Sequence, residues 1–460
     1  MPVLSPWDGH RSAEVAAPTP DEVADIVNTA RAALPVTRAT PRSQRAAVLE
    51  LTASALEDRA EEFARVILQE TGKTIRDCRA EVARAVPTLR FSADAARHLA
   101  GEQLALDAVV GIDGRLALTV PRPIGVVAAI PAFNYPLLLA AHKVGPAIAA
   151  GCPFVLKPAD RTPLSAVMLG EEILRHGWPA AAVSVIPGDA DVGRALTSDP
   201  GIDLITFTGS TAVGHAIAAQ AGPIKALLEL GSNAPTLVFA DADLRSVVDR
   251  TVVGGFTANG QSCISVQRIL VERSRYDEFV DALAEKVRAL RCGDPADAAT
   301  DVGPVIDDGA AARIGALIQD AEERGARIVV GGTREGRLIQ PTLVAGLDVS
   351  MRLHREEVFG PVVAVAPFDT VDEAVALAND TPFGLQAGVF TDSLDVALSI
   401  SERLEFGSVH INEISTFRPD HMPYGGVKAS GLGKEGPVYM AREMSEFTVV
   451  SMKRPGAAHG

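Results

Sequence analysis

Cysteine is scarce in this chain and shows none of the spacings that form disulfide frameworks or metal sites. Among 460 residues there are four cysteines, which lie far apart and form no CxxC pair: Cys78, Cys152, Cys263 and Cys292. A chain of this length builds its core without disulfide support, and one core rarely grows beyond about 250–300 residues. We therefore expect two large lobes, free thiols and a reducing, cytoplasmic setting.

Positive charge is also in deficit, with 43 Lys and Arg against 58 Asp and Glu and a net charge of -15. This balance argues against a nucleic-acid partner, because such proteins concentrate basic residues to neutralise phosphates. The start of the chain has no basic segment leading into an apolar one, so no secretory signal is expected. The long uncharged run between Arg122 and Lys143 contains Pro131, Asn134 and Pro136, which would interrupt a lipid-spanning helix. No membrane partner is therefore expected.

Several common catalytic patterns are missing or incomplete. The nine histidines show no HxxxH or HExxH spacing, and no serine lies in a GxSxG turn. We therefore expect no metal. Residues 431–436 match GxGxxG literally, but no strand is expected before them and too few residues follow for a βαβ unit. Gly72-Lys73-Thr74 resembles the end of a phosphate loop, yet Ile67 stands where the first glycine belongs, so we interpret it as a helix end.

The hydrophobic pattern predicts an α/β protein with two doubly wound lobes and a small β element. Residues 19–100 show helical periodicity. The pattern predicts one helix that begins near residue 19 and two longer helices over 41–70 and 76–100. Residues 101–122 alternate about a turn at Asp113-Gly114 and predict a hairpin. The tail from Glu446 is β-rich, and we expect it to pair with the hairpin or with another subunit.

Two series of short apolar runs separated by helix-length segments follow the hairpin, as in parallel sheets covered by helices. The best boundary between the lobes lies near residue 231. The first series has its expected strands at 124–130, 153–156, 183–186 and 204–207, and its helices at 137–149, 163–175, 189–197 and 210–220. The second has expected strands at 235–240, 267–271, 327–330, 362–367 and 388–390.

Cys263 stands in Gly260-Gln-Ser-Cys263, a polar loop with a glycine, and not in an apolar run. An isolated cysteine is more often a small buried hydrophobic residue than a nucleophile. Its surroundings decide between the two, because Cys263 ends the fifth of seven motifs along the chain: Pro131-Ala-Phe-Asn134-Tyr-Pro136, Leu156-Lys157-Pro-Ala-Asp160, Phe207-Thr-Gly209-Ser210, Leu228-Glu229-Leu230-Gly231, Asn259-Gly-Gln-Ser-Cys263, Glu356-Glu357-Val-Phe359-Gly-Pro361 and Pro423-Tyr-Gly-Gly426-Val-Lys-Ala-Ser-Gly431. In content and order these motifs resemble those of the aldehyde dehydrogenase superfamily, and the resemblance extends from about residue 4 to residue 453.

The resemblance implies a Rossmann-like cofactor-binding lobe formed by residues 1–100 and 121–231. It implies a catalytic lobe over 232–430 and an oligomerisation element formed by 101–120 and 431–460. The family pairs its hairpin and terminal strand across subunits, so a homodimer or homotetramer is expected. The motifs are most similar to those of lactaldehyde dehydrogenase and of non-phosphorylating glyceraldehyde-3-phosphate dehydrogenases.

The implied reaction oxidises an aldehyde to its acid through a thioester. Cys263 would attack the aldehyde as a thiolate, an effective nucleophile near neutral pH. The side-chain amide of Asn134 and the backbone N–H of Cys263 would stabilise the oxyanion. Glu229 would activate the water that hydrolyses the thioester, provided that its apolar surroundings raise its pKa. Another interpretation of Glu229, a buried ion pair, stays open.

The cofactor is expected to be NAD, or else NADP. Ser210 opens a helix directly after a strand, where backbone amides can receive a phosphate. By resemblance, Lys157 and Glu357 hold the two riboses, and Phe359 packs near the cofactor. Asp160 would bind free ribose hydroxyls and repel a 2′-phosphate, which favours NAD. The remaining expected cofactor-binding residues are Gly209, Gly214, Leu230 and Gly231.

The substrate is expected to be a short aliphatic aldehyde, with or without a hydroxyl or an acidic group. Arg84, Tyr135 and Arg418 resemble positions at the substrate mouth of relatives, where arginines could clamp an anion. Ser262 replaces the arginine that phosphate-binding relatives carry before the nucleophile, which counts against a phosphorylated substrate. For Arg84 the alternative is a surface ion pair with Glu81.

Two other functions stay open. A coenzyme A-acylating enzyme would resolve the same thioester with a thiol and would not need Glu229 as a base. A non-catalytic protein could have kept the scaffold, although it would have little reason to retain Cys263, Asn134, Glu229 and Lys157 together.

Overall fold

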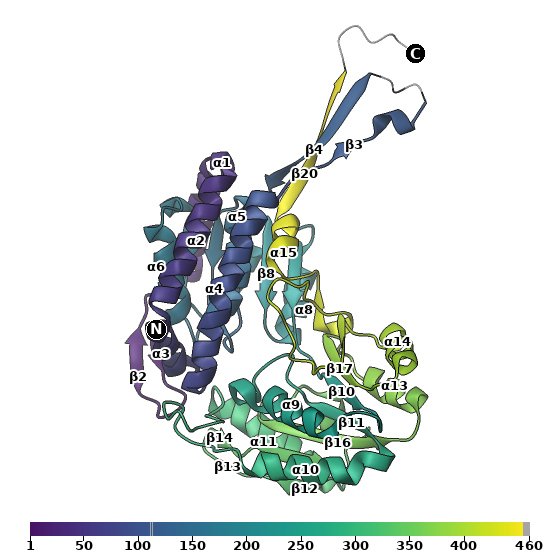
Figure 1. Ribbon diagram of the computed structural model, residues 1–460. Coiled ribbons are helices and arrows are strands. Elements are labelled where there is room, and N and C mark those ends of the chain that lie inside the picture. The colour runs from purple at the N-terminus through teal and green to yellow at the C-terminus, as the bar shows by residue number, and fades with distance from the viewer. Residues whose placement is uncertain (111, 113, 454–460) are drawn as a thin grey trace.

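Residues 1–110, 112 and 114–453 are described in the computed structural model, which has two α/β lobes and a projecting β arm (Figure 1). The first lobe is built on a sheet of strand order β19-β9-β8-β5-β6-β7 within the described residues. Its strands are parallel except β19, which runs antiparallel to β9. The bounds are β5 Val127–Ile130, β6 Phe154–Leu156, β7 Val183–Val185, β8 Leu204–Thr208, β9 Lys225–Glu229 and β19 Gly431–Leu432.

Helices cover both faces of this sheet, because alternate side chains of each strand belong to different cores. On β5, Val127 and Ala129 join the core of α2 to α6, whereas Ala128 and Ile130 join the core of α1, α7 and α8. This is the doubly wound arrangement that the buried runs predict. The helices are α1 Val23–Ala39, α2 Arg42–Asp58, α3 Ala60–Thr71, α4 Ile75–His98, α5 Pro136–Ala150, α6 Leu164–Arg175, α7 Ala190–Ser198, α8 Thr211–Ala221 and α15 Pro437–Glu443, and a small hairpin, β1 Pro2–Leu4 with β2 Arg11–Glu14, precedes them.

The second lobe repeats this plan on a sheet of order β12-β15-β16-β11-β10-β17-β18, again within the described part of the chain. Leu237 of β10 joins the core under α11, α13 and α14, and its neighbour Val238 joins the core under α9 and α10. The strands are β10 Pro235–Val238, β11 Arg268–Glu272, β12 Arg327–Val330, β15 Thr342–Ala345, β16 Val362–Phe368, β17 Gln386–Phe390 and β18 Ser408–Ile411. The helices are α9 Leu244–Phe256, α10 Tyr276–Arg288, α11 Asp308–Glu323, α12 Arg352–Arg355, α13 Val371–Asn379 and α14 Leu394–Arg403, with a hairpin of β13 Arg334–Glu335 and β14 Leu338–Ile339.

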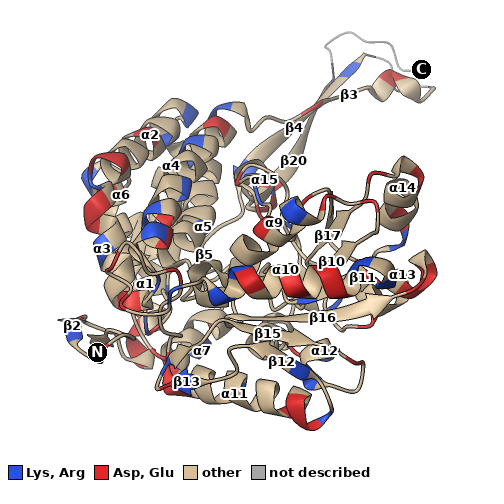
Figure 2. Ribbon diagram, turned by 60° about the horizontal axis from the view of Figure 1, so that its bottom comes forward, with Lys and Arg blue, Asp and Glu red and all other residues tan. Residues whose placement is uncertain are grey.

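Charged residues are found on the outer helices of this lobe, such as α10 and α13, along which acidic and basic positions are interspersed (Figure 2). Strand β16 between them carries no charge and is buried along most of its length. In the described ranges, no helix is both long and apolar enough to cross a membrane.

The arm is a three-stranded sheet in which β20 (Ser445–Lys453) pairs with β4 (Arg115–Pro123), and β4 pairs with β3 (Gln103–Leu104). It extends away from both lobes in Figure 1. The terminal strand therefore pairs with the hairpin of its own chain, one of the two partners predicted for it. Asp113, half of the expected turn, lies outside the described residues.

The structure corrects three details of the expected organisation. The helix expected over 41–70 is two helices, because Arg59 leaves helical geometry (φ -104°, ψ 22°). Strands β9, β15 and β18 were not expected, although β9 carries Glu229 at its end. Residues 431–460 were all assigned to the arm, but β19 extends the first sheet and α15 packs on α4 and α5. The arm takes its second long strand only from Ser445.

Candidate active site

A cavity of about 1030 Å³ opens between the two lobes, where the carboxyl ends of the first sheet's strands face loops of the second lobe. Parallel sheets bind ligands at this edge, because the connecting loops diverge there. Of the sequence-predicted site residues, Gly214 alone does not line it; its glycine instead lets α8 pack against Leu230, whose side chain would clash with a Cβ. The predicted residues that do line it are Arg84, Asn134, Tyr135, Lys157, Asp160, Gly209, Ser210, Glu229, Leu230, Gly231, Ser262, Cys263, Glu357, Phe359 and Arg418.

The loop that carries Cys263 is held in an unusual backbone conformation. Ala258, Asn259 and Gly260 all have left-handed φ angles, of 53°, 58° and 67°. The Asn259 amide stabilises the turn by donating to the carbonyls of Gly72 (3.1 Å) and Pro304 (2.9 Å). At Gly260 a Cβ would lie 2.1 Å from the Gly360 carbonyl oxygen, so only glycine fits. The loop is thus fixed before it delivers Cys263 to the cavity.

The thiol of Cys263 lies 3.1 Å from the hydroxyl of Tyr424. Burial raises the pKa of this thiol to about 12, while the hydrogen bond between the thiol and Tyr424 and the charge of Arg418 act in the opposite direction. The thiol is therefore protonated at neutral pH in this state, and both neighbours favour its ionised form. Tyr424 belongs to a motif that the sequence singles out, but its contact with Cys263 was not predicted.

Asn134 comes from the first lobe, between β5 and α5, and reaches the nucleophile loop. Its Nδ2 donates to the carbonyl of Gln261 at 2.9 Å, two residues before Cys263. The side chain is buried. The predicted partners Asn134 and Cys263 are thus brought together although 129 positions separate them in the sequence.

Glu229 lies at the end of β9, is 4% exposed, and has an Oε2 atom without a hydrogen-bond partner among the described residues. Burial, followed by the charge of Glu435, raises its pKa well above the usual value for glutamate. Glu435 keeps its own charge, with a pKa lowered to about 2, because Lys143 (2.9 Å) and Arg418 (2.8 Å) both pair with it against the effect of burial. Glu229 therefore loses its proton less readily than an ordinary glutamate and forms no ion pair among the described residues, so the buried ion-pair interpretation is wrong.

The substrate end of the cavity contains the two predicted arginines, each already paired. Arg418 lies over the ring of Tyr424 at 3.6 Å and binds Glu435. Arg84 binds Asp420 through two contacts, at 2.7 and 3.1 Å. Its expected alternative, a surface pair with Glu81, is wrong, because Glu81 is fully buried and pairs with Lys73.

Tyr135 and Ser262 complete the predicted substrate set. The ring of Tyr135 has the Lys73 ammonium 4.1 Å from its centre on one side, and the residue lines the cavity. Ser262 lies next to the nucleophile, and its carbonyl accepts from Ser265 at 3.0 Å. The position before Cys263 therefore adds no charge to the cavity.

The other end of the cavity has the donors and acceptors that a dinucleotide needs. Lys157 is buried, which lowers its pKa, and its ammonium donates to the Pro158 carbonyl at 3.2 Å. Burial raises the pKa of Glu357 to about 7, and its Oε1 accepts from the Ser232 amide at 2.9 Å. Both keep hydrogen-bonding capacity for ribose hydroxyls. A Cβ on Gly231 would lie 2.8 Å from Glu357 Oε2, so this glycine keeps the cradle open.

Two further features of this end suit a phosphate and a ring. Ser210 caps the N-terminus of α8, accepting from Val213 at 3.4 Å, and this end of the helix faces the cavity. Phe359 has a left-handed φ of 48° and packs edge-on against Phe133 with ring centres 5.7 Å apart. Asp160 is exposed at the rim, and Asp189, which was not predicted, lines the same end. The residues present therefore fit NAD(P).

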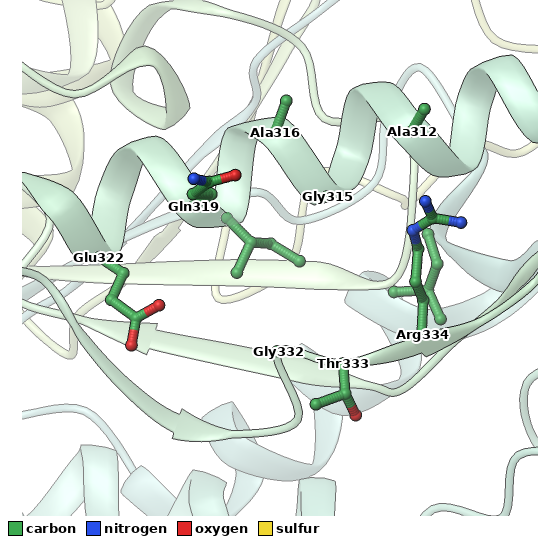
Figure 3. Close-up of a pocket in the computed structure, with 10 residues that line it drawn as sticks. Ala312, Gly315, Ala316, Gln319, Glu322, Gly332, Thr333 and Arg334 are labelled. Carbon is green, nitrogen blue, oxygen red and sulfur yellow. The ribbon is translucent and has the colours of Figure 1, made fainter.

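A second hollow of about 400 Å³ lies between α11 and the segment from Gly332 to Ile339 (Figure 3). Small side chains of α11, such as Ala312 and Ala316, line one wall, and Thr333 and Arg334 line the other. It shares no lining residue with the large cavity and contains none of the predicted residues.

Comparison with known proteins agrees with this geometry. The model of the aldehyde dehydrogenase family matches residues 1–450. A 3-sulfolactaldehyde dehydrogenase of Priestia aryabhattai is 43% identical over 98% of this chain and 94% of its own length. The solved structure of aldehyde dehydrogenase 21 from Physcomitrella patens, in complex with its reaction product succinate, superposes with a TM-score of 0.97 at 38% identity, covering 100% of this chain and 96% of the other. A glyceraldehyde-3-phosphate dehydrogenase of Methanocaldococcus jannaschii, complexed with NADP, gives 0.95 at 34% identity, covering 99% of each chain.

The chain belongs to the aldehyde dehydrogenase family, and it is an NAD(P)-dependent oxidoreductase that converts an aldehyde to its acid. The expected mixed α/β fold with two lobes is confirmed. Glu435 and Lys143, which shape the charge around Glu229, were not predicted. Glu435 lies inside the GxGxxG match at 431–436 that carries no dinucleotide fingerprint.

Proposed function

We propose that Cys263 is the nucleophile, that Asn134 stabilises the oxyanion and that Glu229 activates water, in the oxidation of a short anionic aldehyde. The observation that carries this proposal is that the three side chains line one cavity beside a dinucleotide cradle. Each provides one function that the reaction needs. The roles follow in the order of the chemistry.

In the first step the Cys263 sulfur bonds to the aldehyde carbon, and the thiol proton is released to water. The carbonyl oxygen becomes an oxyanion, which the Nδ2 amide of Asn134 and the backbone N–H of Cys263 stabilise, a contribution of about 3 kcal/mol per donor. Gln261 orients the Asn134 amide by accepting one of its hydrogens. The amide is therefore preorganised before the aldehyde binds.

Lys157, Glu357 and the N-terminus of α8 would hold NAD(P), which would supply the acceptor for the hydride that the carbon loses. Reformation of the C=O bond leaves a thioester on Cys263. Glu229 in its ionised form then removes a proton from water, the hydroxide adds to the thioester carbon, and the C–S bond breaks. Cys263 leaves as a thiolate, and the product is a carboxylic acid.

The substrate that we propose is a short aldehyde with a sulfonate or carboxylate group. Three cations and two anions are joined by ion pairs at this end of the cavity: Arg84, Arg418 and Lys143 with Asp420 and Glu435. These five groups together carry one positive charge in excess. Such an excess favours an anionic ligand. The relatives named above point the same way, since 3-sulfolactaldehyde carries a sulfonate and succinate carries carboxylates.

A substrate screen with wild type and Cys263→Ala tests the nucleophile and the substrate class together. We expect sulfoacetaldehyde and succinate semialdehyde to give a higher kcat/KM than propanal, and Cys263→Ala to produce no NADH. Arg418→Gln should raise KM for the anionic aldehydes by about 10- to 100-fold, the effect of a charged hydrogen bond of about 1.5–3 kcal/mol. Equal effects on propanal would contradict the anionic substrate.

Arg84 permits a matched control on the same helix. Arg84→Gln should raise KM for anionic aldehydes, whereas Arg90→Gln removes a partly exposed arginine that pairs with Glu57, away from the cavity. We expect Arg90→Gln to leave KM unchanged. If both variants shift KM alike, the effect comes from overall charge and not from the cavity.

NAD is the proposed cofactor in preference to NADP. Asp160 and Asp189 lie at the cradle end, and their charges oppose the lowering of the Lys157 pKa by burial. Two carboxylates there would repel a 2′-phosphate. A higher kcat/KM with NADP than with NAD would contradict this preference.

Hydrolysis to the acid, and not transfer to coenzyme A, fits the unpaired Glu229 in the cavity. Assays with and without coenzyme A distinguish the two, because acyl transfer would make turnover depend on the thiol.

The arm supports a further proposal, a homodimer or homotetramer, because it exposes apolar side chains: Val120, Phe447, Val449, Val450 and Met452. Light scattering of wild type and of a chain ending before residue 445 tests it. The four cysteines are free, which supports a cytoplasmic location, because the cytoplasm keeps thiols reduced.

A further inference from the structure

The first two turns of α4 contact both catalytic segments through two buried carboxylates. Asp77 and Glu81 are four residues apart, so they lie on one face of the helix. Each accepts hydrogen bonds from main-chain amides of a different segment, one leading to Cys263 and the other starting after Asn134. We infer that Asp77 and Glu81 are positioning residues that fix the distance between the nucleophile and the oxyanion donor across the two lobes.

Glu81 holds the segment of Asn134. Its Oε1 accepts from the amides of Leu137 (2.9 Å) and Leu138 (3.1 Å) in the first turn of α5. These are amides that a helix cannot satisfy by itself. The other oxygen pairs with Lys73, whose ammonium also lies over the ring of Tyr135. The turn containing Asn134 and Tyr135 is therefore held from the α5 side and from the ring side at once.

Asp77 holds the loop of Cys263. Its Oδ2 accepts from the amide of Ala258 at 3.0 Å, and the Gly72 carbonyl, just before α4, accepts from Asn259 at 3.1 Å. Ala258 and Asn259 are the two non-glycine residues of this loop with left-handed φ angles. Such a conformation costs about 1–3 kcal/mol per residue and persists only where the surroundings enforce it. The α3–α4 junction provides part of that enforcement from the opposite lobe.

The hydrogen bonds form a closed circuit. Glu81 on α4 binds the start of α5, which directly follows Asn134 in the chain. The Asn134 amide donates to Gln261 at 2.9 Å, and the turn before Gln261 donates through the Ala258 amide to Asp77, which is again on α4. Moving either carboxylate would shift the Asn134 amide relative to the Cys263 sulfur. A shift of about 1 Å can cost about 100-fold in rate, because the oxyanion forms at one position only.

Glu70 provides a matched control because it also accepts hydrogen bonds from the first amides of a helix, but of a helix that does not line the cavity. It is fully buried near the end of α3 and accepts from the amides of Leu164 (2.7 Å) and Ser165 (3.2 Å) at the start of α6. No residue of α6 lines the cavity. Removing the Glu70 carboxylate should therefore lower stability without changing the geometry of the site.

The experiment compares variants that keep or lose the acceptor oxygen. Lys73→Met/Glu81→Gln keeps a carbonyl oxygen for the α5 amides, whereas Lys73→Met/Glu81→Leu removes it, and neither leaves an unpaired lysine. Asp77→Asn and Asp77→Leu form the second pair, and Glu70→Gln and Glu70→Leu form the control pair. We expect the leucine variants of Glu81 and Asp77 to lower kcat by about 10- to 100-fold relative to their amide partners. KM for NAD should stay unchanged, and kcat should differ by less than about twofold within the Glu70 pair.

Two further measurements separate positioning from loss of stability. In an Asn134→Ala background, the difference between the Glu81 pair should disappear, because a residue that acts through Asn134 has nothing left to position. Alkylation of Cys263 by iodoacetamide, measured by peptide mass spectrometry, needs no oxyanion donor. The alkylation rate should differ between Asp77→Asn and Asp77→Leu. It should be the same in the glutamine and leucine variants of Glu81.

The inference rests on the proposed roles of Asn134 and Cys263, and its failure can be told apart from theirs. If Asn134→Ala alone leaves kcat unchanged, the proposed role of Asn134 is wrong. If Asn134→Ala lowers kcat but the Glu81 and Asp77 pairs behave like the Glu70 pair, the positioning role is wrong. The positioning role is also wrong if the Glu81 effect persists in full in the Asn134→Ala background. If the leucine variants fail to fold, Lys73→Met/Glu81→Ala and Asp77→Ala, which also remove the acceptor oxygen, take their place in the same comparisons, and a kcat equal to that of the amide partners contradicts the inference.

Discussion

Replacing Glu229 by glutamine should separate the two halves of the reaction. The substitution keeps the size of the side chain and removes its ability to accept a proton. Glu229 is 4% exposed and its Oε2 has no partner among the described residues, so no existing hydrogen bond has to break at that atom. General bases contribute about 10²- to 10⁴-fold to a rate. Steady-state kcat of Glu229→Gln should therefore fall by about that factor.

The assay is stopped-flow absorbance of NADH at saturating aldehyde and NAD. The first turnover should still release about one equivalent of NADH per active site, since hydride transfer precedes the step that needs Glu229. Turnover after this burst should be slow, because the thioester accumulates. Glu229→Asp, which keeps a carboxylate on a shorter side chain, should recover part of the steady-state rate. Loss of the burst together with the steady state would refute the assignment to hydrolysis, as would a steady-state rate equal to wild type.

Further predictions concern the oxyanion, the pH profile and the cofactor. Asn134→Ala should lower kcat about 10²- to 10³-fold in single-turnover assays while KM for NAD stays constant, and an equal loss of NAD affinity would contradict a role limited to the oxyanion. Because burial and Glu435 raise the pKa of Glu229 and this acid must lose its proton to act, kcat should rise with pH through that raised pKa. Glu435→Gln removes a negative charge and should move this limb to lower pH; a shift to higher pH would refute the electrostatic argument. Glu357→Gln should raise KM for NAD by a larger factor than it changes kcat. Asp160→Ala should increase the ratio of kcat/KM with NADP to kcat/KM with NAD.

Much of the fold could be predicted from the sequence, because buried parallel strands appear as short apolar runs between helix-length segments. The runs before Lys157 and Ser210 are strands β6 and β8. Strand β9 was missed, since it begins with Lys225 and ends with Glu229 and so lacks an uninterrupted apolar pattern. The bend at Arg59 was missed because the hydrophobic periodicity of α2 and α3 continues across it.

The candidate site was predictable where its residues belong to compact motifs, and unpredictable where it depends on distant pairs. Cys263, Asn134 and Glu229 stand in such motifs, and the structure brings them to one cavity. The partner of Arg84 is Asp420, 336 residues away, so local helix spacing favoured the wrong partner, Glu81. No periodicity in a sequence encodes a contact of that kind.

The positions of Glu435 and Tyr424 show a second reason. Both lie in glycine-rich segments whose pattern indicates turns, and neither residue type indicates by itself which side chain it will meet. Only the folded chain places the Tyr424 hydroxyl beside the Cys263 sulfur and Glu435 between Lys143 and Arg418.

The most direct test of the proposed reaction is mass spectrometry of acid-quenched Glu229→Gln after mixing with NAD and an anionic aldehyde. The predicted result is an acyl group on the peptide that contains Cys263, in an amount that matches the NADH released. The matched control is Cys292→Ala in the same background, which should carry the same adduct. NADH release with no adduct on Cys263, or with the adduct on another cysteine, would contradict the thioester mechanism.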